Sequence, residues 1–386
     1  MMIDEKLLLL KEIMSEYAIE FRKIGLIIDE NPESIYQYIN LDIIRNISRM
    51  NIPKEFNDKP LEILNYEYYG DTCLERVVAI EQLAYGDLGV LLACPGPSLS
   101  GQVINDFGDK KQKEYYYNKL LNKPTWTFFA LSEPTKGSDA SNVETRVVFN
   151  QEKNKYSLNG EKYFVGNGCR GDIGIVFAKR NSEPLSMKIV LIDREKNKFT
   201  SEKIDSMGVR GVELSSLVFK NCEVDEWQLL GEHLSSAKRG IWGAITTFNK
   251  MRPGIAAMGL GLSQAVVDYV KCQFKQMPIN SKNKIERLEY LINSLRNLVY
   301  QTAAKIDQDP IKNGYFSSIS KLQSIQITNQ VINEAIDILG VNSMYDHPFL
   351  EKAYRDSRAI EYMEGTSNIQ KLNIFQSYTK GRYQIG

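Results

Sequence analysis

The chain has 386 residues, of which 43% are hydrophobic, enough for two or three domains with a sizeable buried core. Lysine plus arginine and aspartate plus glutamate both number 48, so the formal net charge is zero and attraction to nucleic acid or anionic membranes is not expected. The longest apolar stretches, such as 7–10 and 89–94, are far shorter than the roughly 20 residues that span a bilayer, and the N-terminus lacks the features of a signal peptide. We therefore expect a cytoplasmic protein.

Cysteine and histidine usage narrows the chemistry. The five cysteines are widely spaced without a C-x-x-C pair, which favours reduced structural thiols. The two histidines, His233 and His347, have no second metal ligand at helical spacing. A zinc site and a Ser-His-Asp triad both usually need positioned imidazoles, so neither is favoured and no metal is expected.

The first third of the chain carries helical periodicity. Apolar residues recur every three or four positions over 3–24, and a second periodic stretch over 74–83 precedes the Pro95-Gly96-Pro97 break. These patterns predict an N-terminal α-helical domain, to which we assign residues 1–122.

The sequence pattern changes near Trp126. Short β-branched or aromatic runs, among them "WTFFA", "RVVFN", "KYSLNGEKYFV" and "MKIVLID", are separated by Gly, Asn, Asp and Ser. Such alternation predicts an antiparallel β domain, a small barrel or sandwich, over residues 123–232.

Long periodic stretches return after Leu230, at 242–276, 285–306 and 317–339, and they predict a helical bundle over residues 233–386. Pro253-Gly254 is expected to kink or end part of the first of these helices. The fold class is therefore α+β, with helices, then strands, then a bundle.

Three short segments are candidates for chemistry. "GNGCRG", 166–171, satisfies G-x-G-x-x-G, but it leads into a strand and no βαβ alternation surrounds it, so a turn between strands is predicted. "ALSEPTKGSDAS", 130–141, follows a strand with small and hydroxyl residues. Its amides, with Ser132 and Ser138, can hold a flat hydrogen-bonding ring or a phosphate, although an ordinary turn has the same composition.

The third segment, "YMEGTSNIQK", places Glu364 just before a helix that Thr366 or Ser367 can cap. Free amides there could bind an oxyanion, and desolvation by Tyr362 and Met363 could raise the pKa of Glu364 toward that of a working base. A solvated surface glutamate remains the alternative.

Five segments in chain order resemble motifs of the acyl-CoA dehydrogenases, and the likeness is to the short- and medium-chain type. "FALSEPTKGSD" is similar to the flavin loop and "KYFVGNG" to the strand that follows it. "DSMGVRGVELSSLVFKNCEV" is similar to the end of the β domain, and "FNKMRPGIAAMGLGLSQAVVDYV" to the helix of the substrate channel. "YRDSRAIEYMEGTSNIQ" is similar to the arginine-aspartate segment and the catalytic loop.

The resemblance implies an N-terminal α-helical domain, a middle antiparallel β domain and a C-terminal four-helix bundle with FAD. It implies that Glu364 is the general base, since the position used by a related branch falls near Met251, where no acid stands. The positions that match substrate contacts are Ser138, Asn249 and Arg252. The positions that match cofactor contacts are Phe129, Leu131, Ser132, Gly137, Ser138, Phe164, Gly166, Gly340, Thr366 and Asn368.

The implied reaction is removal of an α proton from an acyl thioester and transfer of the β hydride to flavin. The implied partners are a thioester on CoA or on an acyl carrier protein, an electron-transferring flavoprotein or another acceptor, and copies of the chain itself in a homodimer or homotetramer.

Several matches to the family pattern fail: one is at a contact to flavin N5, and the others are on the side that holds the ADP half of FAD. Gly166 stands where the family has a threonine, Gln273, Gln276 and Met277 replace an Arg-x-x-Phe-Gly segment, and "DILGVNS" keeps Gly340 but loses a glutamine and two glycines. A lost charge-assisted contact costs on the order of 1.5 to 3 kcal/mol, so weaker FAD binding is expected. Two alternatives stay open: a flavin oxidase or monooxygenase on the same scaffold, and a binding protein that has lost FAD.

Overall fold

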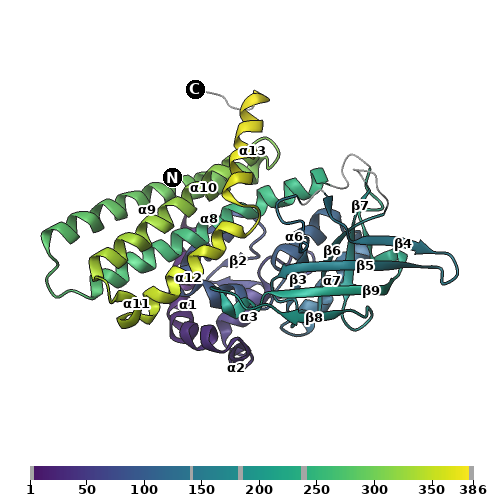
Figure 1. Cartoon of the computed structure of the whole chain (residues 1–386), viewed down its shortest axis with the longest axis horizontal. Coiled ribbons are helices and arrows are strands. Elements are labelled where there is room, and N and C mark those ends of the chain that lie inside the picture. The colour runs from purple at the N-terminus through teal and green to yellow at the C-terminus, as the bar shows by residue number, and fades with distance from the viewer. Residues whose placement is uncertain (1–3, 140–141, 181–185, 236–240, 382–386) are drawn as a thin grey trace.

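The structure is a computed structural model that describes residues 4–139, 142–180, 186–235 and 241–381. Helices come first, a β-sheet follows, and a second set of helices ends the chain (Figure 1). The N-terminal helices are α1 (Glu5–Glu30), α2 (Ile35–Tyr38), α3 (Asp42–Arg49), α4 (Cys73–Gly86), α5 (Leu88–Ala93), α6 (Ser98–Phe107) and α7 (Lys110–Asn122), with a small hairpin of β1 (Leu61–Ile63) and β2 (Tyr66–Tyr68).

The N-terminal helices pack against the C-terminal ones. Helix α4 contacts α1 and, more extensively, α8 (Ile241–Cys272). The two helices come close at Gly261, where an added Cβ would lie 2.1 Å from the carbonyl oxygen of Glu81. The long periodic stretch predicted at the N-terminus is confirmed as α1, whose first turn is capped by the side chain of Asp4.

The middle of the chain forms one eight-stranded sheet in the order β10-β7-β6-β4-β5-β9-β8, with β3 paired to β6. The pairs are antiparallel except that β3 runs parallel to β6 and β4 makes one parallel bridge to β6. The predicted antiparallel domain is therefore corrected at these strands, because side-chain alternation does not reveal strand direction. The strands are β3 (Thr127–Ala130), β4 (Arg146–Asn150), β5 (Lys155–Val165), β6 (Ile173–Lys179), β7 (Met187–Asp193), β8 (Thr200–Lys203), β9 (Ser215–Val224) and β10 (Leu229–Leu230).

Both faces of the central strands are buried. Successive residues of a strand point to opposite faces, so Ile175 packs with Val103 of α6 and Tyr117 of α7, whereas Val176 packs with Leu217 on the other face. "GNGCRG" lies between β5 and β6, which confirms a turn between strands.

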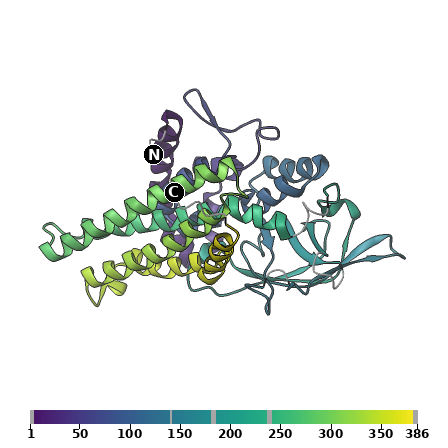
Figure 2. The same cartoon turned by 90° about the horizontal axis from the view of Figure 1, so that it is seen from above.

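The C-terminal helices are α8, α9 (Ile279–Gln308), α10 (Gly314–Leu339), α11 (Ser343–Asp346), α12 (Pro348–Tyr362) and α13 (Ser367–Thr379). Seen from two directions, α8, α9 and α10 lie side by side as a bundle (Figure 1, Figure 2). Helix α8 continues through Pro253. The prediction that this proline could end part of the helix is therefore wrong. Packing against α4 and α10 offsets the missing backbone N–H.

One hydrophobic core joins the two helical regions, with Leu10 of α1, Val77 of α4, Val266 of α8, Leu295 of α9 and Ile332 of α10 among its members. The order of helical, β and helical parts is thus the one that the sequence predicts. The domain limits at 122/123 and 232/233 stay predictions.

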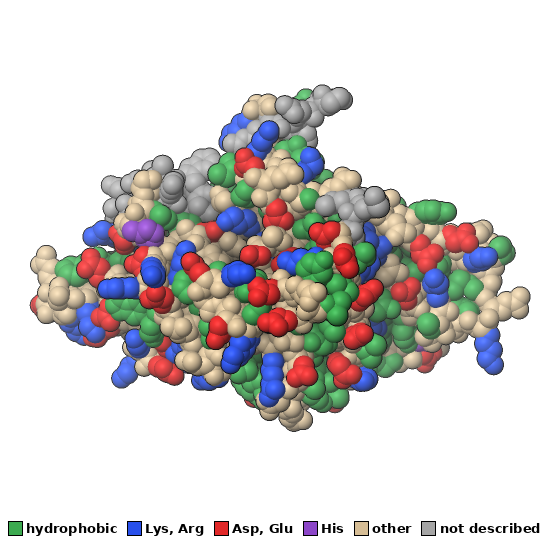
Figure 3. Space-filling view, turned by 180° about the vertical axis from the view of Figure 1, so that it is seen from behind, with side chains coloured by type: hydrophobic (Ala, Val, Ile, Leu, Met, Phe, Trp, Pro, Cys, Tyr) green, Lys and Arg blue, Asp and Glu red, His purple; other side chains and the backbone are tan. Residues whose placement is uncertain are grey.

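The surface agrees with a balanced charge. On the face shown in Figure 3, lysine and arginine side chains are interspersed with aspartate and glutamate. No helix among the described residues is long and apolar enough to cross a membrane.

Candidate active site

Glu364 lies in the short loop between α12 and α13. Helix α12 ends at Tyr362 with Met363 as its C-cap, and the next two residues are left-handed, with φ of 52° at Glu364 and 95° at Gly365. A left-handed glutamate is uncommon and costs free energy that the surroundings must offset. The loop is therefore held in one conformation by its neighbours.

Those neighbours are three side chains that bind the carbonyl groups of the loop. The Lys321 ammonium on α10 donates to the carbonyls of Met363 and Gly365. Arg252 on α8 donates to the carbonyl of Glu364 at 3.2 Å, and Gln370 on α13 donates to the carbonyls of Glu364 and Gly365 at 3.2 and 2.8 Å. We call Lys321, Arg252 and Gln370 the loop clamp.

Glu364 is half-buried beside this clamp. Its Oε2 atom is buried and has no hydrogen-bond partner among the described residues. Burial raises the pKa of Glu364 to about 7, and the nearby cations Arg252, Lys321 and Arg76 oppose the rise. Such a group exchanges a proton near neutral pH, as a general base must. A solvated surface glutamate does not describe this site.

The start of α13 is capped differently from the sequence expectation. Thr366 occupies the N-cap position, but its side chain makes no cap hydrogen bond. Instead, the carboxylate of Glu361 on α12 accepts from the backbone N–H of Ser367 at 2.7 Å and from its hydroxyl at 2.6 Å. A carboxylate from the preceding helix thereby binds the free backbone N–H at the start of α13, a role that was predicted for a local hydroxyl.

A chain of contacts leads from the base toward the sheet. The Arg252 guanidinium donates from Nη1 to the Oδ1 atom of Asn249 at 3.2 Å, and it lies over the Phe248 ring, 5.4 Å from the ring centroid. Phe248 in turn meets Phe129 at 5.9 Å between ring centroids. The amide of Asn249 also donates to the carbonyl of Pro310, so Asn249 positions Arg252.

The loop after β3 is fixed by a buried ion pair. Phe129, Leu131 and Ser132 are half-buried at the end of this strand. The Glu133 carboxylate lies 2.9 Å from the ammonium of Lys162, which also donates to the carbonyl of Leu131 at 3.0 Å. The same carboxylate accepts from the backbone N–H and hydroxyl of Thr145. All of these bonds keep the end of β3 in place.

Phe164 and Gly166, at the end of β5, differ in their surroundings. Phe164 has a left-handed backbone, with φ of 56°, and its side chain is 62% exposed. A bulky residue with a left-handed backbone and an exposed ring is unusual. It offers a surface suited to a ligand ring. A Cβ added to Gly166 would touch Val212 at 3.3 Å, so the turn leaves little room there.

The remaining predicted cofactor positions lie in three separate places: after β3, at the start of α13 and at the end of α10. Gly137 and Ser138 are exposed in the loop after β3, and a Cβ at Gly137 would meet nothing within 4 Å. Thr366 is half-buried and Asn368 exposed at the start of α13, and Gly340 ends α10 with φ of 93°. The structure thus brings Glu364, Arg252, Asn249 and Phe129 into one connected cluster, whereas Gly340 stands apart at the end of α10.

Sequence reasoning missed five residues that build the site: Lys162, Lys321, Glu361, Gln370 and Arg76. The sequence did offer a signal for two of them. Lys321 is a charged residue inside the periodic stretch 317–339, and Arg76 is a charged residue inside the periodic stretch 74–83. Buried charges need partners, so each marks a position worth examining.

Two family descriptions match the chain: "Acyl-CoA dehydrogenase, middle domain" over residues 128–222 and "Acyl-CoA dehydrogenase, C-terminal domain" over residues 238–379. The short-chain specific acyl-CoA dehydrogenase of Megasphaera elsdenii is 30% identical over 78% of this chain and 81% of its own length. The acryloyl-CoA reductase (NADH) of Anaerotignum propionicum is 27% identical over 96% of this chain and 94% of its own length. The solved structure of the prolyl acyl carrier protein oxidase AnaB is similar, with a TM-score of 0.82, 22% identity and coverage of 98% of this chain and 100% of that one.

The fold and the buried carboxyl group define a flavoenzyme of the acyl-CoA dehydrogenase type. The chain belongs to the acyl-CoA dehydrogenase family, as the two matched regions and the 30% identical relative show. Members of this family depend on FAD and dehydrogenate acyl thioesters of CoA or of an acyl carrier protein.

Proposed function

We propose that this chain dehydrogenates an acyl thioester between its α and β carbons, with Glu364 as the general base. The observation that carries the proposal is the buried Oε2 atom of Glu364, which has no hydrogen-bond partner in the part of the chain that the structure describes, while the loop clamp holds the backbone around it. A base in this state is positioned without being neutralised by a close ion pair. Its backbone N–H is the donor we assign to the thioester oxygen, where negative charge develops.

The residues on the flavin side fit FAD. Half-buried Phe129 and Leu131 and exposed Phe164 offer apolar surface, and the turn leaves open space at Gly137. When bound, FAD supplies the acceptor for the β hydride. On the ADP side, exposed Gln273 stands where the family has arginine, which supports weaker binding of the cofactor.

The carrier of the thioester is CoA or an acyl carrier protein, which share the phosphopantetheine arm. Relatives act on each kind, and one of them is named for the reductive direction. The same base and acceptor serve both directions, because the reverse reaction passes through the same transition state. We propose the oxidative direction, with an electron-transferring flavoprotein as the next acceptor.

The test is the anaerobic visible spectrum of FAD-loaded protein during addition of acyl thioesters on CoA and on a carrier protein. Bleaching of the flavin band by at least one of them is expected, and the Glu364→Gln variant should bind FAD but lose bleaching by about 1000-fold or more, as expected for loss of a base. Glu195→Gln, on the surface, serves as the matched control.

Full bleaching by the Glu364→Gln variant would refute the role of this residue. Rapid reoxidation of the reduced flavin by air would favour an oxidase. Failure to load FAD under any condition would favour the binding-protein alternative.

A further inference from the structure

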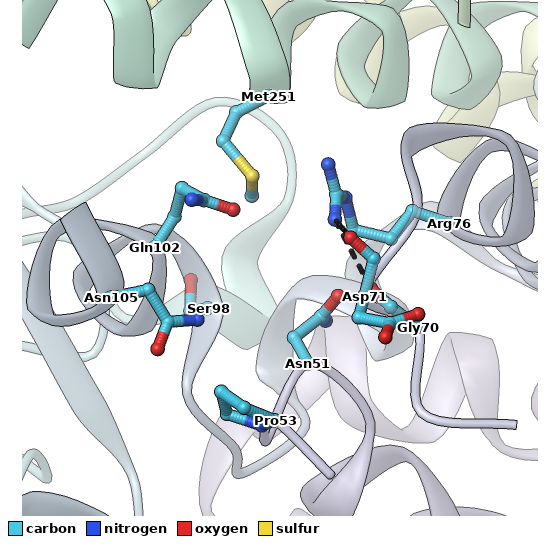
Figure 4. A pocket seen from close by; sticks show the side chains of 9 residues that line it. All are labelled: Asn51, Pro53, Gly70, Asp71, Arg76, Ser98, Gln102, Asn105 and Met251. Atoms are coloured by element: carbon cyan, nitrogen blue, oxygen red, sulfur yellow. Dashed lines mark hydrogen bonds between the residues drawn. The ribbon is translucent and has the colours of Figure 1, made fainter. Parts of the chain in front are cut away.

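A polar pocket opens next to the candidate base, between α4, α6 and α8 (Figure 4). Met251 reaches into it from α8, Arg76 lies on the side of α4, and Gln102 with Asn105 lies opposite on α6. The cavity volume is about 80 Å³, smaller than the roughly 150 Å³ of a protein cavity that takes benzene. The lining residues are Asn51, Pro53, Gly70, Asp71, Arg76, Ser98, Gln102, Asn105 and Met251.

Arg76 is the buried charge of this pocket. Its residue is 7% exposed, and its guanidinium donates to the carbonyls of Gly70, Asp71 and Lys250 at 3.1, 3.0 and 3.3 Å. No ion pair joins Arg76 to a carboxylate in the part of the chain that the structure describes. Because a buried cation that forms no direct ion pair is costly, a position that keeps one has a use for its charge.

Three amides beside Arg76 also have unused hydrogen-bonding capacity. The Oδ1 atom of Asn51 is buried and has no partner among the described residues. Asn105 uses its Oδ1 to accept from the Tyr117 hydroxyl at 2.7 Å, which leaves its NH₂ group for the pocket. Gln102 donates to Asp106 at 3.1 Å and keeps a second N–H. The pocket wall therefore offers N–H donors from Gln102 and Asn105 beside the Arg76 guanidinium, together with one acceptor, the Oδ1 atom of Asn51.

The neighbouring acids do not cancel this preference. The carboxylate of Asp106 accepts from Gln102, Lys250 and Thr247, so its oxygens are already used. Asp71 lines the rim, but it is exposed and its charge is screened by water. Arg76 thus remains the dominant charge inside the pocket.

The pocket lies close to the loop that carries Glu364. Met251 directly precedes Arg252, which binds the carbonyl of Glu364. The positive charge of Arg76 also acts on the carboxyl group of Glu364. A group bound in this pocket would therefore lie near the proposed base, at the acyl end of the substrate.

From this geometry we infer that the acyl group is short and carries an oxygen acceptor, a carboxylate or a neutral hydroxyl or carbonyl, that binds Arg76. The inference rests on the proposed function and names its substrate class. A long alkyl chain is disfavoured both by the small volume and by the desolvation of Arg76 that it would impose. A carboxylate would form a two-pronged pair with the guanidinium, which is the geometry that arginine recognises best.

The experiment compares four acyl groups of similar length: glutaryl, 4-hydroxybutyryl, butyryl and 4-aminobutyryl. Each is presented as a thioester for flavin bleaching and as an unreactive thioether for binding, on CoA and on free pantetheine. At least one oxygen-bearing group should exceed butyryl by about tenfold or more in binding, the size of a charged hydrogen bond. Tightest binding of glutaryl identifies a carboxylate as the group that Arg76 binds. Tightest binding of 4-hydroxybutyryl identifies a neutral acceptor.

The variants are Arg76→Met, Arg76→Lys and the control Arg287→Met, an exposed arginine of α9. Arg76→Met should reduce the preference over butyryl to near one, Arg76→Lys should keep part of the preference for glutaryl, and Arg287→Met should leave the preference intact. Melting temperature and FAD content are recorded for each. If Arg76→Met does not fold, the order in which the unaltered protein and Arg76→Lys bind the four groups still tests the inference.

Three outcomes would overturn the inference. Tightest binding of butyryl means that the pocket does not select an acceptor, and tightest binding of 4-aminobutyryl assigns recognition to Asp71 instead. An equal loss for all four groups in Arg76→Met, with a dependence on CoA against pantetheine, places the carrier arm in the pocket. Because thioether binding needs no turnover, absence of bleaching with a clear binding order would count against the proposed function alone.

Discussion

At the scale of single residues, the environment of Glu364 opposes its negative charge while keeping it available. Burial raises its pKa to about 7, and the same burial lowers the pKa of Lys321 to about 8. Each charge partly stabilises the other, so the two groups titrate together. The cation is committed to backbone carbonyls, and this leaves Glu364 free to accept a proton from a substrate.

This pKa predicts how stability depends on pH. An unfolded glutamate titrates near about 4.3, so the native protein binds more protons than the unfolded chain between about pH 4.3 and 7. The free energy of unfolding should therefore fall as pH rises through this window. Glu364→Gln should match the unaltered protein near about pH 4 and exceed it by about 1 to 3 kcal/mol near about pH 8.

Urea unfolding of both proteins at the two pH values measures the difference. The exposed change Glu195→Gln is the control and should show no such pH dependence. An equal stability difference at both pH values would contradict a raised pKa at Glu364.

At the scale of elements, three helices meet at one loop. Lys321 comes from α10, Arg252 from α8 and Gln370 from α13, and all three bind carbonyls of the same three residues. The loop conformation is therefore decided by how the helices pack. Small shifts of α10 or α8 would change the position of Glu364.

Lys321→Met tests this arrangement. The change removes bonds to the carbonyls of Met363 and Gly365, so stability should fall by about 1 to 3 kcal/mol. It also removes a cation that lowers the pKa of Glu364, so the pH at which bleaching reaches half its maximal rate should rise.

Rapid-mixing measurements of bleaching across pH 5.5 to 9 give that midpoint, the range being roughly that in which a group with pKa about 7 titrates. Lys282→Met, on the exposed side of α9, is the matched control. Lost stability with an unmoved midpoint would show that Lys321 acts only as a structural support.

At the scale of the whole molecule, α13 projects from the bundle (Figure 1). Its side chains Leu372 and Phe375 are 53% and 62% exposed. Large apolar side chains on a projecting helix favour contact with another protein surface. This supports the homodimer or homotetramer that the resemblance implies.

A charge on this helix should weaken that assembly. Phe375→Glu is expected to shift the protein toward monomer, because an isologous interface brings the new carboxylate in twice. Light scattering after size-exclusion chromatography measures the mass, and Gln376→Glu, one position further along the exposed helix, is the control. If Phe375→Glu leaves the mass unchanged, α13 does not form the interface.

The sequence by itself determined the order of helical, β and helical parts, the turn at 166–171, and the place of Glu364 before the last helix. These features depend on periodicity and on turn residues within a few positions of one another, so local patterns carry them. The motifs around Glu364 and after β3 also sufficed to indicate the family.

Only the tertiary structure decided which distant residues surround those motifs. Lys321, Arg76 and Glu361 reach the site through the packing of α10, α4 and α12, and no local pattern specifies that meeting. The parallel pairing of β3 with β6 and the continuity of α8 through Pro253 have the same origin. Helices and strands are set by neighbours in sequence, whereas a pKa and a polar pocket are set by neighbours in space.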